Sequence, residues 1–329
     1  MKKITSLFAI LVLLASCQKE NLNKISTSPG NTDETDGVQT VITKRSCGAY
    51  DVLQQQLAED PALAQRMDAI ENYTQKVVRG EVPMRLVNGV ITIPVVVHVV
   101  YNTTAQNISD AQVQSQIDVL NEDFGNTNVD RSKVPALFQP VDATVGIKFT
   151  LDRIIRKKTT KKSFSTNDAV KKSANGGDNV IDATTYLNMW ACNLSNGLLG
   201  YAQFPGGKSA TDGVVILYNA FGRTGNLIPG YNLGRSATHE VGHWMNLRHI
   251  WGDARCGNDL VNDTPVANAE NYGCPGYPHK STCTGTPTEM TMNYMDYTDD
   301  ACMYMFSNGQ KTRVSAVFAP GGPRAKMAQ

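Results

Sequence analysis

The sequence of 329 residues has little that would attract a polyanion or cross a membrane. Its 31 lysines and arginines nearly balance 30 aspartates and glutamates, and the formal net charge of +1 gives no electrostatic reason to expect a nucleic acid as partner. No basic run is interleaved with aromatic residues, no internal stretch is long enough to span a bilayer, and no internal repeat is present. The 41% hydrophobic and 19% charged residues fit a globular chain of one large or two modest domains.

The amino-terminal stretch MKKITSLFAILVLLASC has the order of a secretory signal. Two lysines precede an apolar run from Ile4 to Leu14, and small residues lead to Cys17, so residues 1–17 are expected to be a signal peptide. The LASC ending resembles a bacterial lipobox, which implies cleavage before Cys17 and lipidation of its thiol; an ordinary signal peptide with an incidental cysteine is the alternative. We therefore expect an exported protein, lipid-anchored to the bacterial cell envelope before processing and in contact with the membrane only through this anchor.

Polar composition and hydrophobic periodicity divide the rest of the chain. Residues 18–45 are rich in Ser, Thr, Asn and Asp and are expected to form a flexible tether. Beyond them the pattern predicts helices within 50–78 with Pro61 starting the second, strands at 90–101, 145–155 and 212–220, and a helix that Ser109 and Gln112 begin as a capping box. This order, followed by a histidine-bearing helix, predicts an α/β (α+β) fold with a twisted mixed sheet, and the weak periodicity after about 250 predicts an irregular remainder.

Cysteines are few and unevenly placed. Export permits disulfides, and removal of Cys17 leaves six cysteines. Four of these lie within 256–302, a region rich in Gly, Pro and Asn that buries little surface, so cross-links are a plausible way to order it. Four cysteines allow three pairings, and their spacing does not choose among them. The seven cysteines are Cys17, Cys47, Cys192, Cys256, Cys274, Cys283 and Cys302.

Histidine is scarce as well, and three of the five histidines fall in ATHEVGHWMNLRH, residues 237–249. Positions i and i+4 share one face of a helix, so His239 and His243 can direct two imidazoles at one ion. Glu240 is placed to reach a metal-bound water, which is the HExxH arrangement of zinc proteases. His249 can join them only if the chain turns sharply, and Asn246 tolerates the left-handed backbone that such a turn requires.

Other interpretations of these histidines lead to different proteins. The imidazoles could simply be hydrogen-bonded inside a buried helix, or they could belong to a closed structural zinc site, which would need a fourth strong protein ligand. The chain could also be a zinc-binding surface lipoprotein without catalytic activity, or a zinc hydrolase whose third ligand is a glutamate. Three nitrogen ligands beside Glu240 favour an open catalytic site.

Several motifs together resemble the pappalysin family of metzincin proteases, in the style of its ulilysin-like members. They are HEVGHWMNLRH, in which Asn246 replaces the usual glycine, LLGYAQFPGG, DTP, NYMDY and CMYMF, and the resemblance covers about residues 90–318. It implies a secreted zinc endopeptidase whose catalytic domain, at 85–329, has an α/β subdomain and an irregular, disulfide-linked lower subdomain. Met295 would form the Met-turn beneath the histidines, and Tyr297 would stabilise the oxyanion; ordinary packing is the alternative for both.

The resemblance also assigns the cysteines and a calcium site in the lower subdomain. It implies the disulfides Cys256–Cys283 and Cys274–Cys302, and it leaves Cys192 alone and buried. It further implies calcium binding near GNDLVNDTP, where the oxygen atoms of a turn suit this ion. Aspartates in a turn are otherwise common as helix caps or solvated residues. The implied calcium ligands are Asp259, Asp263 and Thr264.

RSCG, at 45–48, resembles the cysteine-bearing motif of latent proteases. Cys47 would bind zinc and block the open position, with residues 46–84 forming a helical prodomain; a disulfide to Cys192 is the alternative.

Relatives of this kind prefer Arg or Lys immediately after the scissile bond, which suggests self-cleavage between Met84 and Arg85. Asp299 and Asp300 are candidates for the acidic pocket that would bind this side chain. The expected partners are protein or peptide substrates, zinc and calcium, and the expected state is a monomer.

Overall fold

The structure is a computed structural model that describes residues 42–82 and 89–328. The predicted signal peptide with Cys17, most of the predicted tether, and the predicted cleavage site at Met84 and Arg85 lie outside the described residues. Within the described ranges, no helix is both long enough and apolar enough to cross a membrane.

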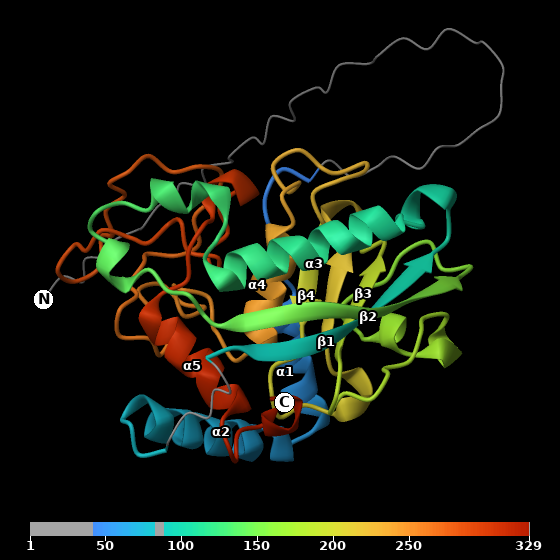
Figure 1. Cartoon of the computed structure of the whole chain (residues 1–329), viewed down its shortest axis with the longest axis horizontal. Helices are drawn as coiled ribbons and strands as arrows, with labels where there is room; N and C mark the ends of the chain where they lie inside the picture. The colour runs from blue at the N-terminus through green and yellow to red at the C-terminus, as the bar shows by residue number, and fades with distance from the viewer. Residues whose placement is uncertain (1–41, 83–88, 329) are drawn as a thin grey trace, which may run out of the picture. The chain divides into compact units, whose positions relative to one another are not determined.

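A five-stranded mixed sheet is the centre of the fold (Figure 1), as the sequence predicted. Its order is β2-β1-β3-β5-β4, and every neighbouring pair is parallel except β4 and β5. The apolar, β-branched composition of β1 is explained by burial on both faces from Val95 to Val100. The strands are β1 (Ile91–Tyr101), β2 (Ile147–Lys158), β3 (Leu187–Cys192), β4 (Gly200–Ala202) and β5 (Val214–Leu217).

Two helices pack against the sheet and against each other. α3 (Asp110–Gly125) runs along β2, and α4 (Arg235–Trp244) packs against β4 and β5 (Figure 1). The predicted capping box of α3 is only half formed. The Ser109 side chain accepts from the backbone N–H of Gln112, but the Gln112 side chain donates to the carbonyls of Tyr218 and Phe221, because these oxygens need donors where the chain leaves β5.

The amino-terminal helices α1 (Ala49–Glu59) and α2 (Ala62–Val78) are separated at Asp60 and Pro61, close to the predicted break. α1 packs against β4, and α2 packs against α5 (Asn308–Phe318), as Figure 1 shows. The Arg313 side chain of α5 is 1% exposed and forms an ion pair with Glu71 of α2, 2.8 Å apart. The packed part of the chain begins before residue 46, because the side chain of Arg45 is buried.

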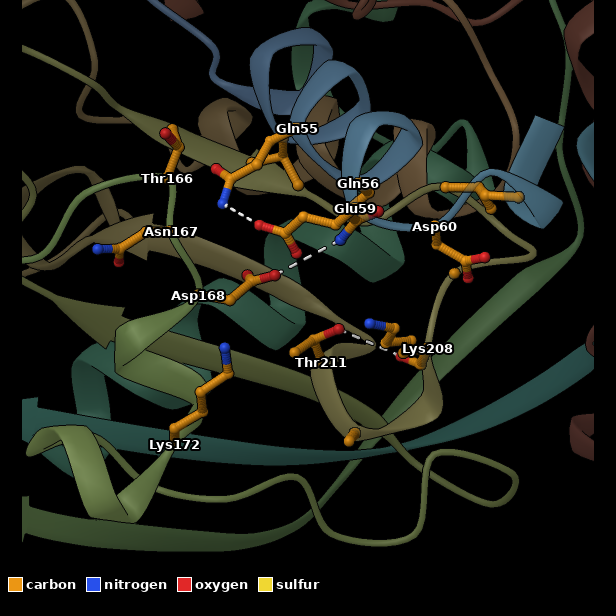
Figure 2. Close-up of a pocket in the computed structure, with 14 residues that line it drawn as sticks. Gln55, Gln56, Glu59, Asp60, Thr166, Asn167, Asp168, Lys172, Lys208 and Thr211 are labelled. Carbon is orange, nitrogen blue, oxygen red and sulfur yellow. Dashed lines mark hydrogen bonds between the residues drawn. The ribbon is translucent and has the colours of Figure 1, made fainter.

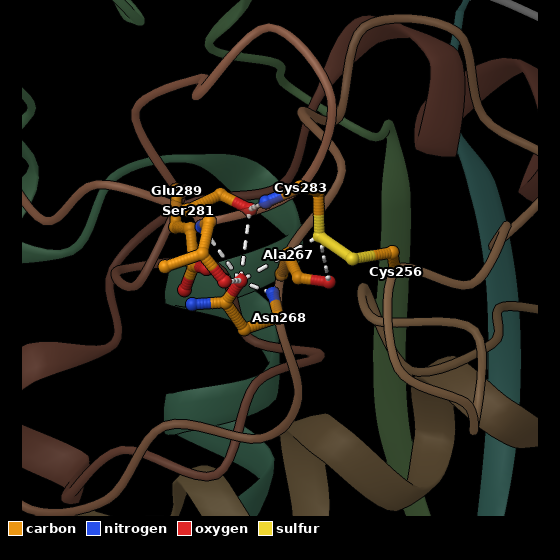
Figure 3. Close-up of a disulfide and its surroundings, with 7 residues drawn as sticks. Cys256, Ala267, Asn268, Ser281, Cys283 and Glu289 are labelled. Atoms are coloured by element: carbon orange, nitrogen blue, oxygen red, sulfur yellow. Dashed lines mark hydrogen bonds between the residues drawn. A yellow bond between two sulfur atoms is a disulfide. The ribbon is translucent and has the colours of Figure 1, made fainter.

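Between Trp244 and Asn308 the chain forms turns, isolated bridges and one short 3-10 helix. Disulfides join Cys256 to Cys283 and Cys274 to Cys302, which is the pairing that the family resemblance implies. Figure 3 shows the first of these beside Asn268, whose side-chain oxygen accepts from the backbone N–H of Thr282 (2.7 Å). Because few regular elements order this region, side-chain hydrogen bonds and cross-links hold it together.

Candidate active site

Helix α4 and the turn that follows it bring three histidines together. His239 and His243 lie one helical turn apart on the same face, and the chain then reverses at Asn246, whose φ of +70° is the left-handed conformation that the sequence predicted. His249 returns to the same point. The Nε2 atom of His243 lies 3.1 Å from Nε2 of His239 and 3.0 Å from Nε2 of His249.

The contacts of the Nδ1 atoms hold the rings so that the three Nε2 atoms face one another. The Nδ1 atoms of His239 and His243 contact the carbonyls of Tyr294 (2.7 Å) and Leu247 (2.8 Å), and that of His249 contacts Asp253. Each Nδ1 atom must therefore donate, and the three Nε2 lone pairs point into one space. Three acceptors at this separation repel unless a cation lies among them, so these residues fit a metal ion.

Burial keeps these imidazoles in the form that binds metals. It is the main cause that lowers the pKa of His239 well below the usual value and the pKa of His243 to about 3, and the neighbouring imidazoles add to the effect. Neutral imidazole is the ligand form, and metal need not compete with protons at neutral pH.

Cys47 completes the metal-binding group. Its Sγ atom and the three histidine nitrogens all lie within 4.8 Å of one another, and in the part of the chain that the structure describes no other group of this kind is found. The Cys47 thiol also donates to Oε2 of Glu240 (3.3 Å). Burial, followed by the charge of Glu240, raises the pKa of Cys47, so ionising this thiol requires a cation among the imidazoles. The alternative disulfide to Cys192 is wrong, because both thiols are free.

The segment around Cys47 lies along the edge strand β4. The backbone N–H of Leu199 donates to Ser46, and the N–H of Gly48 donates to Gly200, both at 2.9 Å, so the two segments run parallel. Gly200 allows this approach, because a Cβ atom there would lie 2.8 Å from Cγ of Glu240. The chain's own segment is thus added as a strand to the edge of the sheet within LLGYAQFPGG.

Met295 and Tyr297 lie next to the histidines from the opposite side. Met295 is fully buried under α4, and a Cβ atom at Gly242 would lie 2.4 Å from its sulfur, so this glycine makes the close contact possible. Sequence reasoning missed Gly242, although a glycine inside an active-site helix is a signal. The Tyr297 hydroxyl accepts from the backbone N–H of Cys47 (3.3 Å), and burial raises the pKa of this phenol, which keeps its proton.

Of the two acidic candidates after the Met-turn, Asp300 receives a cation. It is fully buried, and its Oδ1 atom pairs with Nη2 of Arg45 at 2.6 Å. Its Oδ2 atom accepts from the backbone N–H of Leu233 (2.8 Å), which fixes the carboxylate. Asp299 is half-buried and does not contact Arg45. The role of Arg45 was missed by sequence reasoning, which placed this residue in the tether.

The two aspartates suggested for calcium have different hydrogen-bond partners. The Asp259 carboxylate accepts from the Thr264 hydroxyl (2.7 Å) and the backbone N–H of Val261 (3.1 Å). Asp263 instead accepts from the Ser307 hydroxyl (2.6 Å) and the N–H of Gly309 (2.8 Å) at the start of α5. Asp263 is therefore the helix cap that was its alternative, and calcium binding stays a prediction.

Comparisons with known proteins agree with this geometry. The peptidase M43 family model, described as pregnancy-associated plasma protein-A, matches residues 170–319. The chain is 34% identical over 242 residues to an extracellular metalloprotease of Pyricularia oryzae, covering 70% of this chain and 75% of the relative. It is 32% identical over 293 residues to an extracellular metalloprotease of Colletotrichum graminicola, covering 84% and 90%.

Two solved structures from Tannerella forsythia have the same fold. A promirolysin mutant matches with a TM-score of 0.79 and 44% identity, covering 86% of this chain and 97% of that one. Mature mirolysin in complex with a cleaved peptide matches with a TM-score of 0.71 and 48% identity, covering 73% and 96%. The three histidines lie within the residues that the family model matches, and the chain is a zinc metallopeptidase of the pregnancy-associated plasma protein-A (pappalysin) family.

Proposed function

We propose that this protein is an endopeptidase made as a latent zymogen, with His239, His243 and His249 as zinc ligands and Cys47 as the blocking ligand. The observation that carries the proposal is the convergence of three Nε2 atoms and the Cys47 sulfur within 4.8 Å, with Glu240 in contact with that sulfur. The position that Cys47 takes is the one that a catalytic site must leave open for water.

When bound, zinc supplies a Lewis acid for the scissile carbonyl and lowers the pKa of water at the open position. Glu240 accepts a proton from the attacking water and delivers it to the leaving amine. Its carboxylate is directed to this place by packing against Gly200, where only a glycine leaves room. The Tyr297 hydroxyl, which now contacts the Cys47 backbone, is placed to donate to the developing oxyanion.

Latency rests on occupation of the cleft by the prodomain. Ser46–Gly48 take the backbone partners of β4 that a substrate would use, and α1 and α2 continue over the surface. Peptidase activity therefore requires release of Cys47 and of these helices. We place the activating cut between Met84 and Arg85, because Arg85 supplies the side chain that the enzyme is proposed to prefer.

A preference for arginine after the scissile bond is explained by Asp300. Arg45 gives the model for recognition, since its guanidinium pairs with Asp300 (2.6 Å) and donates to the Thr298 carbonyl (3.1 Å). A substrate arginine reaching the same carboxylate would replace Arg45, whereas a neutral side chain would leave Asp300 buried and unpaired. Lysine would make the weaker, single-point contact.

We further infer export with lipidation at Cys17, and calcium binding at Asp259 with Thr264. The names of the relatives, which are extracellular metalloproteases, support export. Asp259 is 4% exposed, and the contacts to its carboxylate are neutral hydrogen-bond donors, so a bound cation would balance its charge. A cut at Met84–Arg85 would release the catalytic domain from the lipid anchor.

The experiment compares zinc-loaded wild type with Glu240→Gln, both after an added protease has removed the prodomain, on peptides that carry Arg, Lys, Leu or Glu after a single cleavable bond. We expect cleavage of the Arg peptide first and the Lys peptide more slowly, and loss of both in the variant while zinc content is unchanged. Equal zinc content with no peptide cleaved by either protein would show that the chain is the zinc-binding lipoprotein instead.

A further inference from the structure

A second polar recognition site lies along β4 from the metal, on the side away from Asp300. The chain runs from Leu199, which pairs with Ser46, into β4, where Gly200 lies opposite Cys47. It then reaches Gln203, which contacts Gln56 of α1. Arg45 and Asp300 lie on the other side of Cys47. If a substrate places its arginine at Asp300, its residues before the scissile bond lie towards Gln203.

A cavity of about 250 Å³ opens here between α1 and two loops of the catalytic domain (Figure 2). Gln56 lines it from the prodomain, and its Nε2 atom donates to Oε1 of Gln203 (3.0 Å) and reaches Oδ2 of Asp168 at 3.5 Å. Figure 2 shows the second of these contacts crossing the cavity. Gln203 is 1% exposed and Asp168 is 7% exposed, so both acceptors are held in a nearly dry site.

The catalytic domain itself fixes both acceptors. Nε2 of Gln203 donates to the Lys208 carbonyl (2.9 Å), and its Oε1 accepts from the Thr211 hydroxyl (2.7 Å), so only the oxygen can face Gln56. Lys171 is 1% exposed, and its Nζ atom lies 2.9 Å from Oδ1 of Asp168, which leaves Oδ2 for a partner. Removal of the prodomain would take the Gln56 amide away from Oε1 of Gln203 and Oδ2 of Asp168, and both acceptors would then be open to a new donor.

We propose that Gln203 and Asp168 form a subsite that takes a neutral amide side chain, glutamine or asparagine, about three residues before the scissile bond of the substrate. This rests on the proposed function, in which Asp300 takes the residue after that bond. Gln56 occupies the subsite in the latent chain, as Arg45 occupies the Asp300 pocket.

The charges around the cavity select an amide over the ionised alternatives. A carboxylate has no proton to donate to either acceptor. A second ammonium or guanidinium would meet a carboxylate already paired with Lys171, and Lys172 and Lys208 also line the cavity. An amide supplies two N–H donors without a charge.

The test uses the enzyme after removal of its prodomain and peptides with arginine after the scissile bond. Gln, Leu, Glu or Lys is placed in turn at the second, third and fourth positions before that bond. At one of these positions we expect kcat/KM for Gln to exceed that for Leu, Glu and Lys by roughly three- to tenfold, the effect of one or two hydrogen bonds. Asp168→Asn should bring the Gln-to-Leu ratio close to one, and Thr166→Val, at the same cavity, should leave this ratio unchanged.

Equal rates for the four residues at all three positions would overturn the subsite and leave the peptidase intact. A preference for Lys or Glu would overturn the amide subsite too, because the cavity would then select a charged side chain. If no peptide in the series is cleaved, the proposed function fails and the subsite with it. The series on the unaltered enzyme decides the question even if Asp168→Asn does not fold.

Discussion

Nη2 of Arg45 and Oδ1 of Asp300 lie 2.6 Å apart, and both side chains are buried. The two residues are 255 positions apart in the sequence and join the proposed prodomain segment to the proposed catalytic domain. Because Asp300 follows the Met-turn, the pair lies at the proposed recognition pocket. Cys47, two residues after Arg45, lies at the metal site. The same short segment therefore fills two parts of the cleft.

Replacement of Arg45 should weaken latency. In Arg45→Ala the Asp300 carboxylate stays buried without its cation, which costs about 3 kcal/mol and loosens the docked prodomain. We expect faster loss of the prodomain from the zinc-loaded zymogen, followed by intact mass over time. Lys76→Ala removes an exposed cation from α2 and should process at the wild-type rate. Identical rates for all three proteins would show that the ion pair does not hold the prodomain.

Tyr297→Phe tests the proposed oxyanion donor. Loss of one hydroxyl that acts only in the transition state should lower kcat by about tenfold to a hundredfold and leave KM nearly unchanged. Steady-state kinetics on the Arg peptide provides the measurement. Tyr272→Phe, whose ring lies 6.1 Å from that of Tyr297, is the matched control. An unchanged kcat in Tyr297→Phe would reduce this residue to a packing role.

Asp296, between Met295 and Tyr297, makes stability depend on pH. Burial raises the pKa of its carboxyl from 3.8 to about 7 in the folded protein. Between about pH 4 and 7 the unfolded side chain is ionised while the folded one holds its proton, so the free energy of unfolding should fall as the pH rises through this window. The size of the pKa rise sets an upper limit of about 4 kcal/mol on the decrease in the free energy of unfolding.

Denaturant unfolding at several pH values checks this expectation in wild type and Asp296→Asn. The variant should show a shallower slope between pH 4 and 7 than wild type, and burial of Asp123, Glu240 and Asp259, which also raises the pKa of these carboxyls, should keep part of the slope. Asp299→Asn, three residues along and only half-buried, should keep the wild-type slope. A slope that is the same in all three proteins would assign the pH dependence to other groups.

Calcium should stabilise the lower subdomain through Asp259. We expect Tm to rise with added calcium in wild type and not in Asp259→Asn, as measured by thermal unfolding in the zinc-loaded protein. Asp263→Asn replaces one of the two oxygens that accept from the start of α5 by an NH2 group, so its Tm should fall with and without calcium by a similar amount. If the Tm of wild type does not change when calcium is added, the proposed calcium binding is wrong.

Local rules were sufficient for much of the site. Helical spacing predicted the shared face of His239 and His243, and the left-handed tolerance of Asn246 predicted the turn that returns His249. The apolar run at 90–101 became β1. These features depend on a few neighbouring residues, so the sequence displays them directly.

Long-range contacts were beyond local rules. Nothing near Arg45 shows that it meets Asp300, and β4 is only three residues long, too short for a periodic signal. Helix α5 was missed although Ser307 and Gln310 form its capping box. At Gln112 a long-range contact overrides a local motif. The capping box predicts that this side chain bonds within its own helix, but it donates to the carbonyls of Tyr218 and Phe221.

The central claim is that this chain is a latent zinc peptidase able to release itself. Its most direct test is intact mass with amino-terminal mapping of the protein from Gln18 onward, incubated with zinc and calcium, for wild type beside Glu240→Ala. We expect wild type to be cut before Arg85 and to lose its prodomain, while Glu240→Ala stays whole. If wild type also stays whole, or if both proteins are cut alike, the chain does not process itself and the claim is contradicted.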